Sequence, residues 1–402
     1  MRARSSWSAI RVSDLQAPRR YALNGGPFGS KLVSNDYVPE GVPVIRGANL
    51  PGHSRFSMND FVFVSESKAD ELLPNNAHPG DLVFTQRGTL GQVGLIPRTS
   101  PFSRFVISQS QMKLTVDEKK ADAAFLYYYF RAPRTVQQIH NLGFSTGVPH
   151  INLDILRNFE VRLPPLHAQK QIRAILSAYD DLIENNTRRI KILEKMAQAI
   201  YREWFVHFRF PGHKKVKLVN SPLGPIPERW SVRKLGEVVE LAYGKALKAE
   251  NRRKGNVPVY GSSGIVGSHD ESLVSGPGVI VGRKGNVGTV HWCDGDFFPI
   301  DTVFYVQTNI SLRYTYYNLQ TQNFISGDAA VPGLSRTQAY SLPILVPAEN
   351  VLTEFEALVE SFFAAMRNLR ERNENLRETR DLLLPRLISG EVDLSEVEVA
   401  GE

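Results

Sequence analysis

Two short turns in the sequence place a cation directly before closely spaced glycines. Arg87 begins the run Arg-Gly-Thr-Leu-Gly, and Lys284 begins Lys-Gly-Asn-Val-Gly 197 residues later. Glycine lets a backbone approach its ligand closely, arginine can bond to two acceptors on a guanine edge, and lysine serves guanine or phosphate. A β-hairpin with a solvated charge explains either turn taken alone. Because the charge recurs in both turns, a nucleic-acid contact and a plain hairpin remain equal alternatives.

Two further segments carry side chains suited to DNA. The run ISQSQMKLTV at 107–116 alternates, which predicts a strand with glutamines and a lysine on one face, and glutamine can pair with adenine. An ordinary exposed strand face is the alternative. The loop at 245–255 is rich in cations, as expected for phosphate contacts that position a protein without reading sequence. The candidate DNA-binding residues are Lys31, Arg46, Arg87, Thr89, Gln109, Gln111, Lys113, Lys245, Lys248, Arg252, Ser262, Ser263, Arg283, Lys284 and Asn286.

Catalytic patterns are missing from the sequence. There is no phosphate-binding GxxxxGK[ST] loop, and the glycine-rich run at 278–288 reads as strand, turn and strand. The histidines lack the spacing of metal ligands, and the adjacent acids Asp180 and Asp181 are expected to be solvated charges at a helix end. We therefore expect no catalytic residue, metal or cofactor, and a protein that holds a ligand rather than converting it.

Composition points to a partner of opposite charge. The 402 residues carry a net charge of +7, with a pI near 9.3, which favours a polyanion. The single cysteine, Cys293, can form neither an internal disulfide nor a cysteine-based zinc site. No apolar run approaches the length of a membrane span, and the N-terminus lacks a hydrophobic signal segment. A cytoplasmic location is expected.

The chain contains one architecture written twice. Trp7-Ser8 recurs as Trp230-Ser231, 223 residues later, and Val148-Pro149 recurs as Val331-Pro332, 183 residues later. Gly29 to Leu32 aligns with Gly244 to Leu247 at an intermediate offset of 215. Matched pairs in the same order, with a steadily falling offset, indicate a duplication whose second copy has lost about forty residues from its loops.

Each copy reads as a β-rich part followed by a long helix. Short runs such as VPVI and GVIVG predict strands, while AAFLYYYF at 123–130 and its counterpart at 312–319 predict helices, so the class is α+β. The expected divisions are a first recognition domain at 1–163, a central helix at 164–206, a basic, proline-rich, extended connector at 207–229, a second recognition domain at 230–346, a C-terminal helix at 347–390 and an acidic tail at 391–402.

Apolar residues recur at heptad spacing in both long helices, which predicts a coiled-coil seam. Two amphipathic helices, each lying on its own domain, are the alternative. Because equivalent seams in one chain can bury each other, we expect an antiparallel pair, related by a pseudo-twofold axis, that acts as a spacer. The polar Asn186 and Asn373 fall in the seam and are expected to set its register.

Several longer stretches resemble the specificity subunit of type I restriction-modification systems. They include NGGPFGSKL and GVPVIRGANL near the start, LPPLHAQKQIRAIL and AIYREWFVHFRFPG at the two ends of the central helix, SPLGPIPERWSVRKLGEVV and PVYGSSGIVG in the second copy, and LLLPRLISGEVDL near the end. The second helix departs from the family's entry pattern, reading PAENVLTEF, and Arg380 occupies a seam position.

This resemblance implies a non-catalytic DNA-binding subunit whose two domains each read half of a split, asymmetric target. Chemistry would come from partners: modification subunits, two of them, that methylate adenine with S-adenosylmethionine, and two motor-nuclease restriction subunits that use ATP. A coiled-coil scaffold joining two protein-binding domains, and a nuclease with an unrecognised site, are the alternatives.

Overall fold

Two four-stranded sheets of the same strand order form the centres of the two copies. The computed structural model describes residues 7–52, 54–143, 149–324 and 333–394, and the chain divides into two units, Met1–Thr187 with Arg372–Glu402, and Arg188–Glu371. In the first unit the order is β2 (Leu23–Gly25), β10 (Gln111–Leu114), β7 (Leu82–Thr85), β8 (Val93–Leu95); in the second it is β15 (Val239–Tyr243), β21 (Val303–Thr308), β18 (Gly278–Gly282), β19 (Val290–Cys293). The expected duplication and the α+β class are confirmed.

A two-stranded ribbon and a short helix also occur in both units. The ribbons pair β1 (Ser8–Arg11) with β11 (Glu160–Leu163) and β14 (Ser231–Lys234) with β22 (Pro343–Val346). The helix α4 (Leu153–Asn158) precedes β11, and α7 (Arg336–Ser341) precedes β22. Asn152 caps α4 and Ser335 caps α7, each side chain accepting a backbone N–H from the first turn, as these residue types favour.

A further sheet in each unit shows where the second copy is shorter. The first unit has β3 (Tyr37–Val38), β5 (Val62–Val64), β4 (Val42–Ile45), β9 (Phe105–Ile107) and β6 (Asn76–Ala77); the second has β17 (Gly264–His269), β16 (Val257–Gly261) and β20 (Phe298–Pro299). Residues 46–61 connect β4 to β5, but only Ser262 and Ser263 connect β16 to β17. The helix α1 (Glu66–Glu71) follows β5 in the first unit. The copies therefore differ in connections and keep their central strands.

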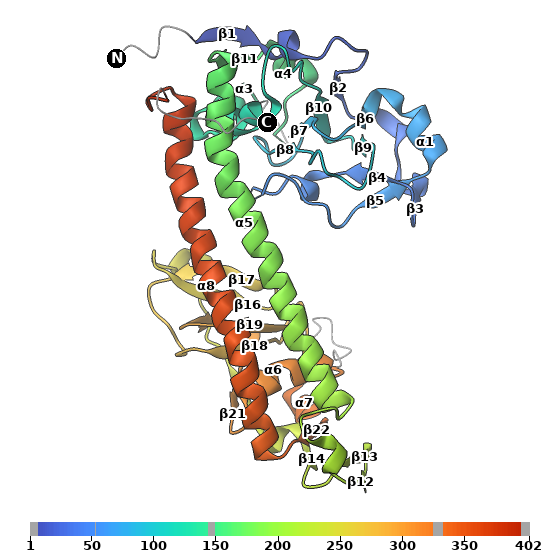
Figure 1. Cartoon of the computed structure of the whole chain (residues 1–402), viewed down its shortest axis with the longest axis vertical. Coiled ribbons are helices and arrows are strands. Elements are labelled where there is room, and N and C mark those ends of the chain that lie inside the picture. Colours follow the sequence, from blue (N-terminus) through green and yellow to red (C-terminus); the bar gives the residue numbers. More distant parts are fainter. Residues whose placement is uncertain (1–6, 53, 144–148, 325–332, 395–402) are drawn as a thin grey trace. The chain divides into compact units, whose positions relative to one another are not determined.

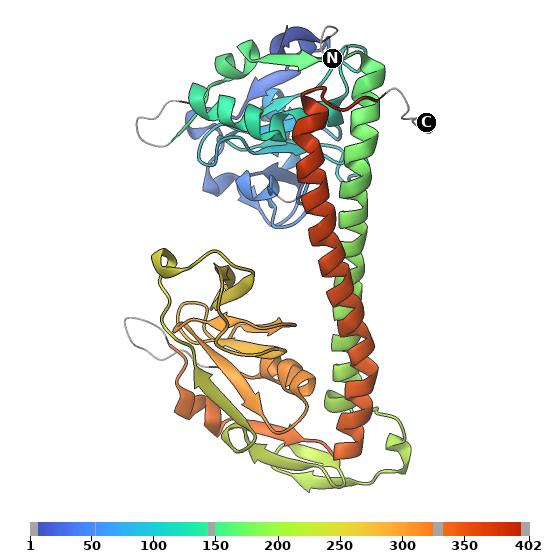
Figure 2. The same cartoon turned by 90° about the vertical axis from the view of Figure 1, so that its left-hand side faces the viewer.

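Aromatic helices join the sheets to the long helices. In the first unit α2 (Ala123–Arg131), followed by α3 (Pro133–Leu142), buries Phe125, Tyr128 and Phe130 in one core with strand residues and with the start of the central helix. In the second unit α6 (Leu312–Thr321) contacts β18 and β19, and its Arg313 pairs with two glutamates of the C-terminal helix. Figure 2 shows α6 lying between that sheet and the long helices.

The two long helices, α5 (Leu166–Tyr201) and α8 (Glu349–Ile388), pack against each other within each unit. In the first unit Ile172 and Leu176 share a core with Leu384 and Leu387. In the second unit Ala197 and Tyr201 belong to one core with Phe355 and Val359. The start of α5 thus meets the end of α8 and the reverse, so the pair is antiparallel, as Figures 1 and 2 show. None of the described helices is both long and apolar enough to cross a membrane.

Register in this seam is marked by a polar pair. The Nδ2 of Asn186 donates to Oδ1 of Asn373 at 2.9 Å, and Asn373 is buried. The predicted placement of both residues in the seam is confirmed. An amide pair of this kind favours one alignment of two helices, because shifting either helix breaks this hydrogen bond.

The connector after α5 is more ordered than an extended chain. It follows the π-helical turn at Arg202–Val206, which ends the central helix, and it contains a hairpin of β12 (Leu218–Ser221) and β13 (Gly224–Pro227). Trp230 stacks on Phe210 at 5.2 Å, and both rings are buried in the core of the second unit. The expectation of an extended connector is wrong because its aromatic side chains bury apolar surface, which draws the backbone against the unit.

Candidate nucleic-acid interface

Equivalent loops emerge at one edge of each four-stranded sheet. Because β10 runs antiparallel to β2 and β7, its first residue lies beside their last residues, with Gln111 opposite Thr85 and Met112 opposite Gly25. In the second unit Val303 lies opposite Gly282, and Phe304 opposite Tyr243. We call the loops at this end of each four-stranded sheet the loop edge of the unit. The loop edge consists of residues 26–31, 86–91 and 108–110 in the first unit, and of residues 244–254, 283–289 and 300–302 in the second.

The two cationic turns lie at these edges with the same backbone pairing. Arg87 forms a β-bridge with His150, and Lys284 forms one with Gly333. Both glycines of each turn have positive φ, 97° and 81° in the first turn and 78° and 76° in the second, so side chains other than glycine would be strained there. Among the described residues neither cation has a hydrogen-bond or ion-pair partner for its side chain. Each turn therefore presents a free charge at its edge.

Gly26 and Gly244 occupy equivalent positions in the two units, which corrects the sequence alignment of Gly29 with Gly244. Strand pairing makes Gly25 equivalent to Tyr243, three residues away from the sequence match of Gly29 with Gly244. A Cβ on Gly26 would collide with the carbonyl oxygen of Ser108, and one on Gly244 with that of Ile300. The residue after the strand must be glycine in both units because the neighbouring loop passes too close for a side chain.

In the second unit Ser262 joins the hairpin of β16 and β17 to the cationic turn. Its Oγ accepts a hydrogen bond from the backbone N–H of Asn286 at 3.4 Å, and its carbonyl accepts one from Thr289 Oγ1 at 2.6 Å. Ser263, the other residue of this two-residue connection, is exposed. The structure therefore brings Ser262, Ser263, Lys284 and Asn286 together at one edge.

Arg283 and Lys245 lie at the same edge. The Arg283 Nη1 donates to the Asp301 carbonyl at 2.8 Å, and its Cζ lies 4.9 Å from the ring centre of Tyr243. Lys245 is exposed, and its backbone N–H donates to the Pro299 carbonyl at 3.0 Å. The edge of the second unit thus gathers several cations on a framework of backbone hydrogen bonds, which suits contact with a polyanion.

Comparison with known proteins shows the family to which the chain belongs. Residues 29–195 and 227–351 match the family described as type I restriction modification DNA specificity domain. The chain belongs to this family. The second matched segment contains all of its loop edge and the first contains all but residues 26–28, so the cations described above lie within DNA-specificity domains of this family.

Individual members of the specificity family resemble this chain either over a short segment or over most of its length at low sequence identity. The type I restriction enzyme MjaVIII specificity subunit of Methanocaldococcus jannaschii is 36% identical over 143 residues, which span 36% of this chain and 32% of that subunit. The MjaIX specificity subunit of the same organism is 21% identical over 347 residues, 79% of each chain. The crystal structure of an S subunit from M. genitalium matches in fold with a TM-score of 0.54 at 18% identity, covering 95% of this chain and 96% of that one.

Two of the predicted DNA-binding residues of this specificity-family chain are buried inside the protein. Gln111 exposes 1% of its surface and Lys113 3%, since β10 is the strand between β2 and β7 and all four of its residues are buried. Their assignment to an exposed reading face is therefore wrong. Alternation predicts that side chains point to opposite faces, but both faces of a central strand can be covered. Burial lowers the pKa of Lys113, although the nearby Asp81 acts in the opposite direction.

Gln109 supports the loop edge rather than presenting an open amide. Its Nε2 donates to the carbonyls of Gly29 at 2.7 Å and Leu32 at 3.0 Å. Both amide protons are occupied, so a bidentate contact to adenine from Gln109 conflicts with this geometry. Lys31 sits inside the loop that Gln109 holds and is exposed. On the other side of residues 108–110, the Gln86 N–H donates to the Ser110 carbonyl, which places the turn of Arg87 and the exposed Thr89 beside the same loop.

Three remaining candidates are engaged within the chain. The Nη2 of Arg46 donates to the Asp60 carbonyl at 2.7 Å, which closes the 46–61 connection. The Nη1 of Arg252 donates to the Val266 carbonyl at 2.6 Å, so this side chain ties the cationic loop to β17. Lys248 forms an exposed ion pair with Glu250 at 3.7 Å, a contact too weak to keep the lysine from another anion.

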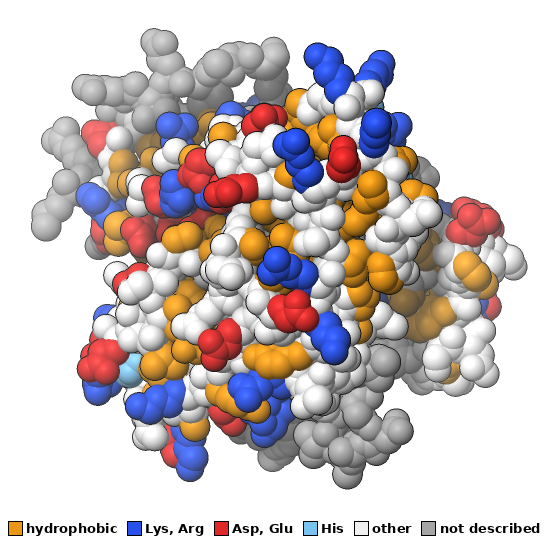
Figure 3. All heavy atoms as spheres, turned by 90° about the horizontal axis from the view of Figure 1, so that it is seen from below, with side chains coloured by type: hydrophobic (Ala, Val, Ile, Leu, Met, Phe, Trp, Pro, Cys, Tyr) orange, Lys and Arg blue, Asp and Glu red, His pale blue; other side chains and the backbone are white. Residues whose placement is uncertain are grey.

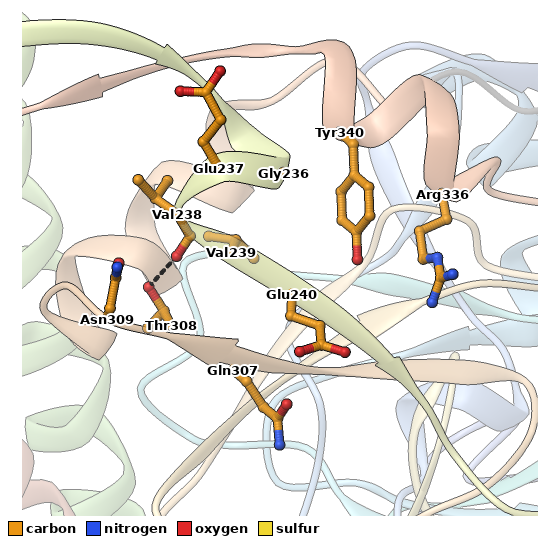
Figure 4. A pocket seen from close by; sticks show the side chains of 10 residues that line it. All are labelled: Gly236, Glu237, Val238, Val239, Glu240, Gln307, Thr308, Asn309, Arg336 and Tyr340. Atoms are coloured by element: carbon orange, nitrogen blue, oxygen red, sulfur yellow. Dashed lines mark hydrogen bonds between the residues drawn. The ribbon is translucent and has the colours of Figure 1, made fainter.

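Surface regions away from the loop edges carry both positive and negative side chains. On the described atoms of the face shown in Figure 3, Lys and Arg side chains are interspersed with Asp and Glu and with apolar patches. The shallow hollow of Figure 4, about 600 Å³ between β15, β21 and α7, is lined by Glu237 and Glu240 beside Arg336 and Tyr340. The hollow itself therefore carries mixed charge. Among the described residues no three His, Cys, Asp or Glu side chains gather as metal ligands would.

Charged contacts also join the first recognition domain to the helices. Arg55 bonds to Asp181 at 2.5 Å and to Glu184 at 2.8 Å, and Tyr128 donates to Asp180 at 2.7 Å. Asp180 exposes 2% of its surface, so the expectation of a solvated charge is wrong for Asp180, although Asp181 is exposed. Both residues lie within α5 rather than at a helix end. Burial, and then the charge of Asp180, raise the pKa of Tyr128 well above its usual range, which keeps this hydroxyl a donor.

Proposed function

We propose that the chain is the non-catalytic recognition subunit of a type I restriction-modification complex that reads a bipartite, asymmetric DNA target. The observation that carries this proposal is the duplicated loop edge inside the two family-matched segments. Each edge has the same backbone frame and a different set of side chains, with Arg87 and Thr89 in one and Lys284 and Asn286 in the other. Equal frames with unlike side chains suit two half-sites of different sequence.

The long helices act in this proposal as the spacer between the half-sites. Both α5 and α8 contribute residues to both units, and their seam contains the Asn186–Asn373 hydrogen bond. A continuous helix pair of fixed register holds two recognition domains at a constant separation, because helix length rises by a set 1.5 Å per residue. A constant separation predicts a constant gap in the target.

Partner subunits supply the chemistry in this proposal. Large apolar side chains stand exposed on the helices in each unit: Leu182 at 52% and Leu382 at 72% in the first, Ile192 at 49% and Leu358 at 40% in the second. Single exposed apolar side chains are common on protein surfaces, so the assignment of partners to these faces rests on the family to which the chain belongs. We assign these faces to two modification subunits that methylate adenine with S-adenosylmethionine, with two motor-nuclease restriction subunits joining the complex. The complex would act in the cytoplasm.

The deciding experiment is selection from random-sequence DNA by the chain together with its modification subunit. We expect enrichment of two unlike half-sites separated by a constant gap, and no such motif when the chain is omitted. Failure to enrich any motif would favour a coiled-coil scaffold with incidental positive charge. Metal-dependent cutting by the purified chain alone would favour a nuclease. Methylation-sensitive sequencing of the same DNA then locates the modified adenine within each half-site.

A further inference from the structure

An exposed tyrosine next to the loop edge of the second unit has two arginines, distant in sequence, packed on its ring. Tyr243 is the last residue of β15 and exposes 51% of its surface. Arg283 follows β18, and Arg336 begins α7. Their guanidinium carbons lie 4.9 Å and 5.0 Å from the centre of the Tyr243 ring. We call these three residues the Tyr243 stack.

The frame around the Tyr243 stack is well defined. The Tyr243 ring packs at 5.0 Å from Phe304 on the neighbouring strand, and Arg283 is held by the Asp301 carbonyl. On α7, the hydroxyl of Tyr340 accepts a hydrogen bond from the Leu241 N–H at 3.0 Å, which ties the helix that carries Arg336 to β15. Figure 4 shows Arg336 and Tyr340 projecting from this one helix. The guanidinium groups are therefore positioned before any ligand arrives.

Neither arginine of the Tyr243 stack has a carboxylate partner among the described residues. Glu240 lines the hollow beside Arg336, but no ion pair joins them. Two other arginines of this unit are paired with carboxylates: Arg253 with Asp270 and Glu271, and Arg370 with Glu194 and Asp294. Lys245 and Lys284, also without carboxylate partners in the described part of the chain, follow Tyr243 and Arg283 closely in sequence. Two arginines without carboxylate partners thus lie at one exposed ring, and two such lysines follow it closely in sequence.

Stacking on an aromatic ring holds a guanidinium by its face and leaves N–H donors at its edge free. Such an edge matches two oxygens of a phosphate, and phosphate contacts position a protein on a duplex without reading its sequence. We propose that the Tyr243 stack is a phosphate clamp for duplex DNA, in which Arg283 and Arg336 bind backbone phosphates beside the second half-site and Tyr243 orients them. This inference rests on the proposed function, gives the predicted candidate Arg283 a specific role, and adds Tyr243 and Arg336, which the sequence patterns did not indicate.

The test measures how DNA affinity depends on salt, using the full complex with the modification subunit. Each phosphate contact contributes a slope of about 0.9 in log affinity against log salt. We expect R336Q and R283Q each to lower the slope by about one and to weaken target and non-target DNA by the same factor. The matched control is R370Q, whose arginine lies on the C-terminal helix of the same unit, is already paired with Glu194 and Asp294, and should leave the slope unchanged.

Two further measurements separate a positioning role from a purely structural one. Y243F keeps the ring and should retain the wild-type slope, while Y243L should lower it without lowering the unfolding temperature in proportion. Neutral methylphosphonate groups placed one at a time beside the second half-site should weaken DNA binding by the wild-type complex at one or two positions. At the position whose phosphate Arg336 contacts, the same replacement should not weaken DNA binding by R336Q any further.

The outcomes separate the two proposals. If the wild-type complex enriches a bipartite motif but R336Q and R283Q, shown to be folded, keep the full salt slope, the clamp is wrong and the recognition function stands. The clamp is also wrong if methylphosphonates weaken R336Q as much as wild type at every position. If the wild-type complex shows no bipartite enrichment, the recognition function itself fails.

Discussion

Asp180 on α5 and Arg380 on α8 form an ion pair at 2.5 Å, although they lie 200 residues apart in the sequence. Asp180 is 2% exposed and Arg380 3%. Burial lowers the pKa of Arg380, but the charge and hydrogen bond of Asp180 outweigh it, so its pKa is raised. Together with the hydrogen bond from Tyr128, this pair joins both long helices to the first recognition domain.

Breaking this pair from one side should be strongly destabilising. D180A leaves a buried guanidinium with only Asp381 to compensate its charge, and a buried charge that loses its partner costs about 3–5 kcal/mol. Urea unfolding of the wild type and the variant measures the loss. The double variant D180L/R380M, which removes both charges, should recover most of it. A double variant no more stable than D180A would contradict this account.

Single substitutions at the two cationic turns should act on different halves of the target. R87A should relax base preference in one half-site only, and K284A in the other only, because each turn belongs to a separate unit. Selection from random-sequence DNA with each variant checks this. R98A serves as a control, since that arginine is paired with Glu118. Relaxation of the same base positions by both variants would refute one domain per half-site.

Lengthening both helices together should change the gap in the target. One heptad added to α5 near Thr187 and one added to α8 near Arg372 preserves the seam and adds about 10 Å at 1.5 Å per residue. At about 3.4 Å per base pair, the gap should grow by about three base pairs, or binding should be lost if the rotated half-site is out of reach. Recovery of the original gap by the lengthened chain would exclude a spacer role.

Alkaline pH should weaken the second unit through Tyr201. Burial raises the pKa of Tyr201 to about 12, above the value near 10 of an unfolded tyrosine. Stability from this group is full below pH 10 and is lost as the pH rises toward 12, because only the unfolded chain releases the proton in that range. The full effect is about 3 kcal/mol at 1.36 kcal/mol per pKa unit.

Y201F removes this titrating group and keeps the ring, so its stability should fall less steeply between pH 9 and 11 than that of the wild type. At pH 7 it should be slightly less stable, since it loses the hydrogen bond from Asn318 at 3.3 Å. Y243F is the control, because Tyr243 is exposed and its removal should leave the alkaline slope unchanged. Equal alkaline slopes for Y201F and wild type would show that Tyr201 is not responsible.

Local patterns in the sequence determined the secondary structure and the duplication. Heptad spacing predicted the seam around Leu176 and Val359, and glycine placement predicted the turns at Arg87 and Lys284, because both signals come from residues close together in the chain. The same signals placed Asn186 and Asn373 in the seam where they pair.

Tertiary structure alone decided which of these residues are accessible and which meet. Alternation at 107–116 could not show that Gln111 and Lys113 would be covered on both sides, since the neighbours of a strand come from distant segments. The burial of Asp180 depends on Arg380, and the stacking of Tyr243 depends on Arg336. Sequence spacing carries information about faces and turns, whereas burial and pairing depend on contacts that exist only once the chain has folded.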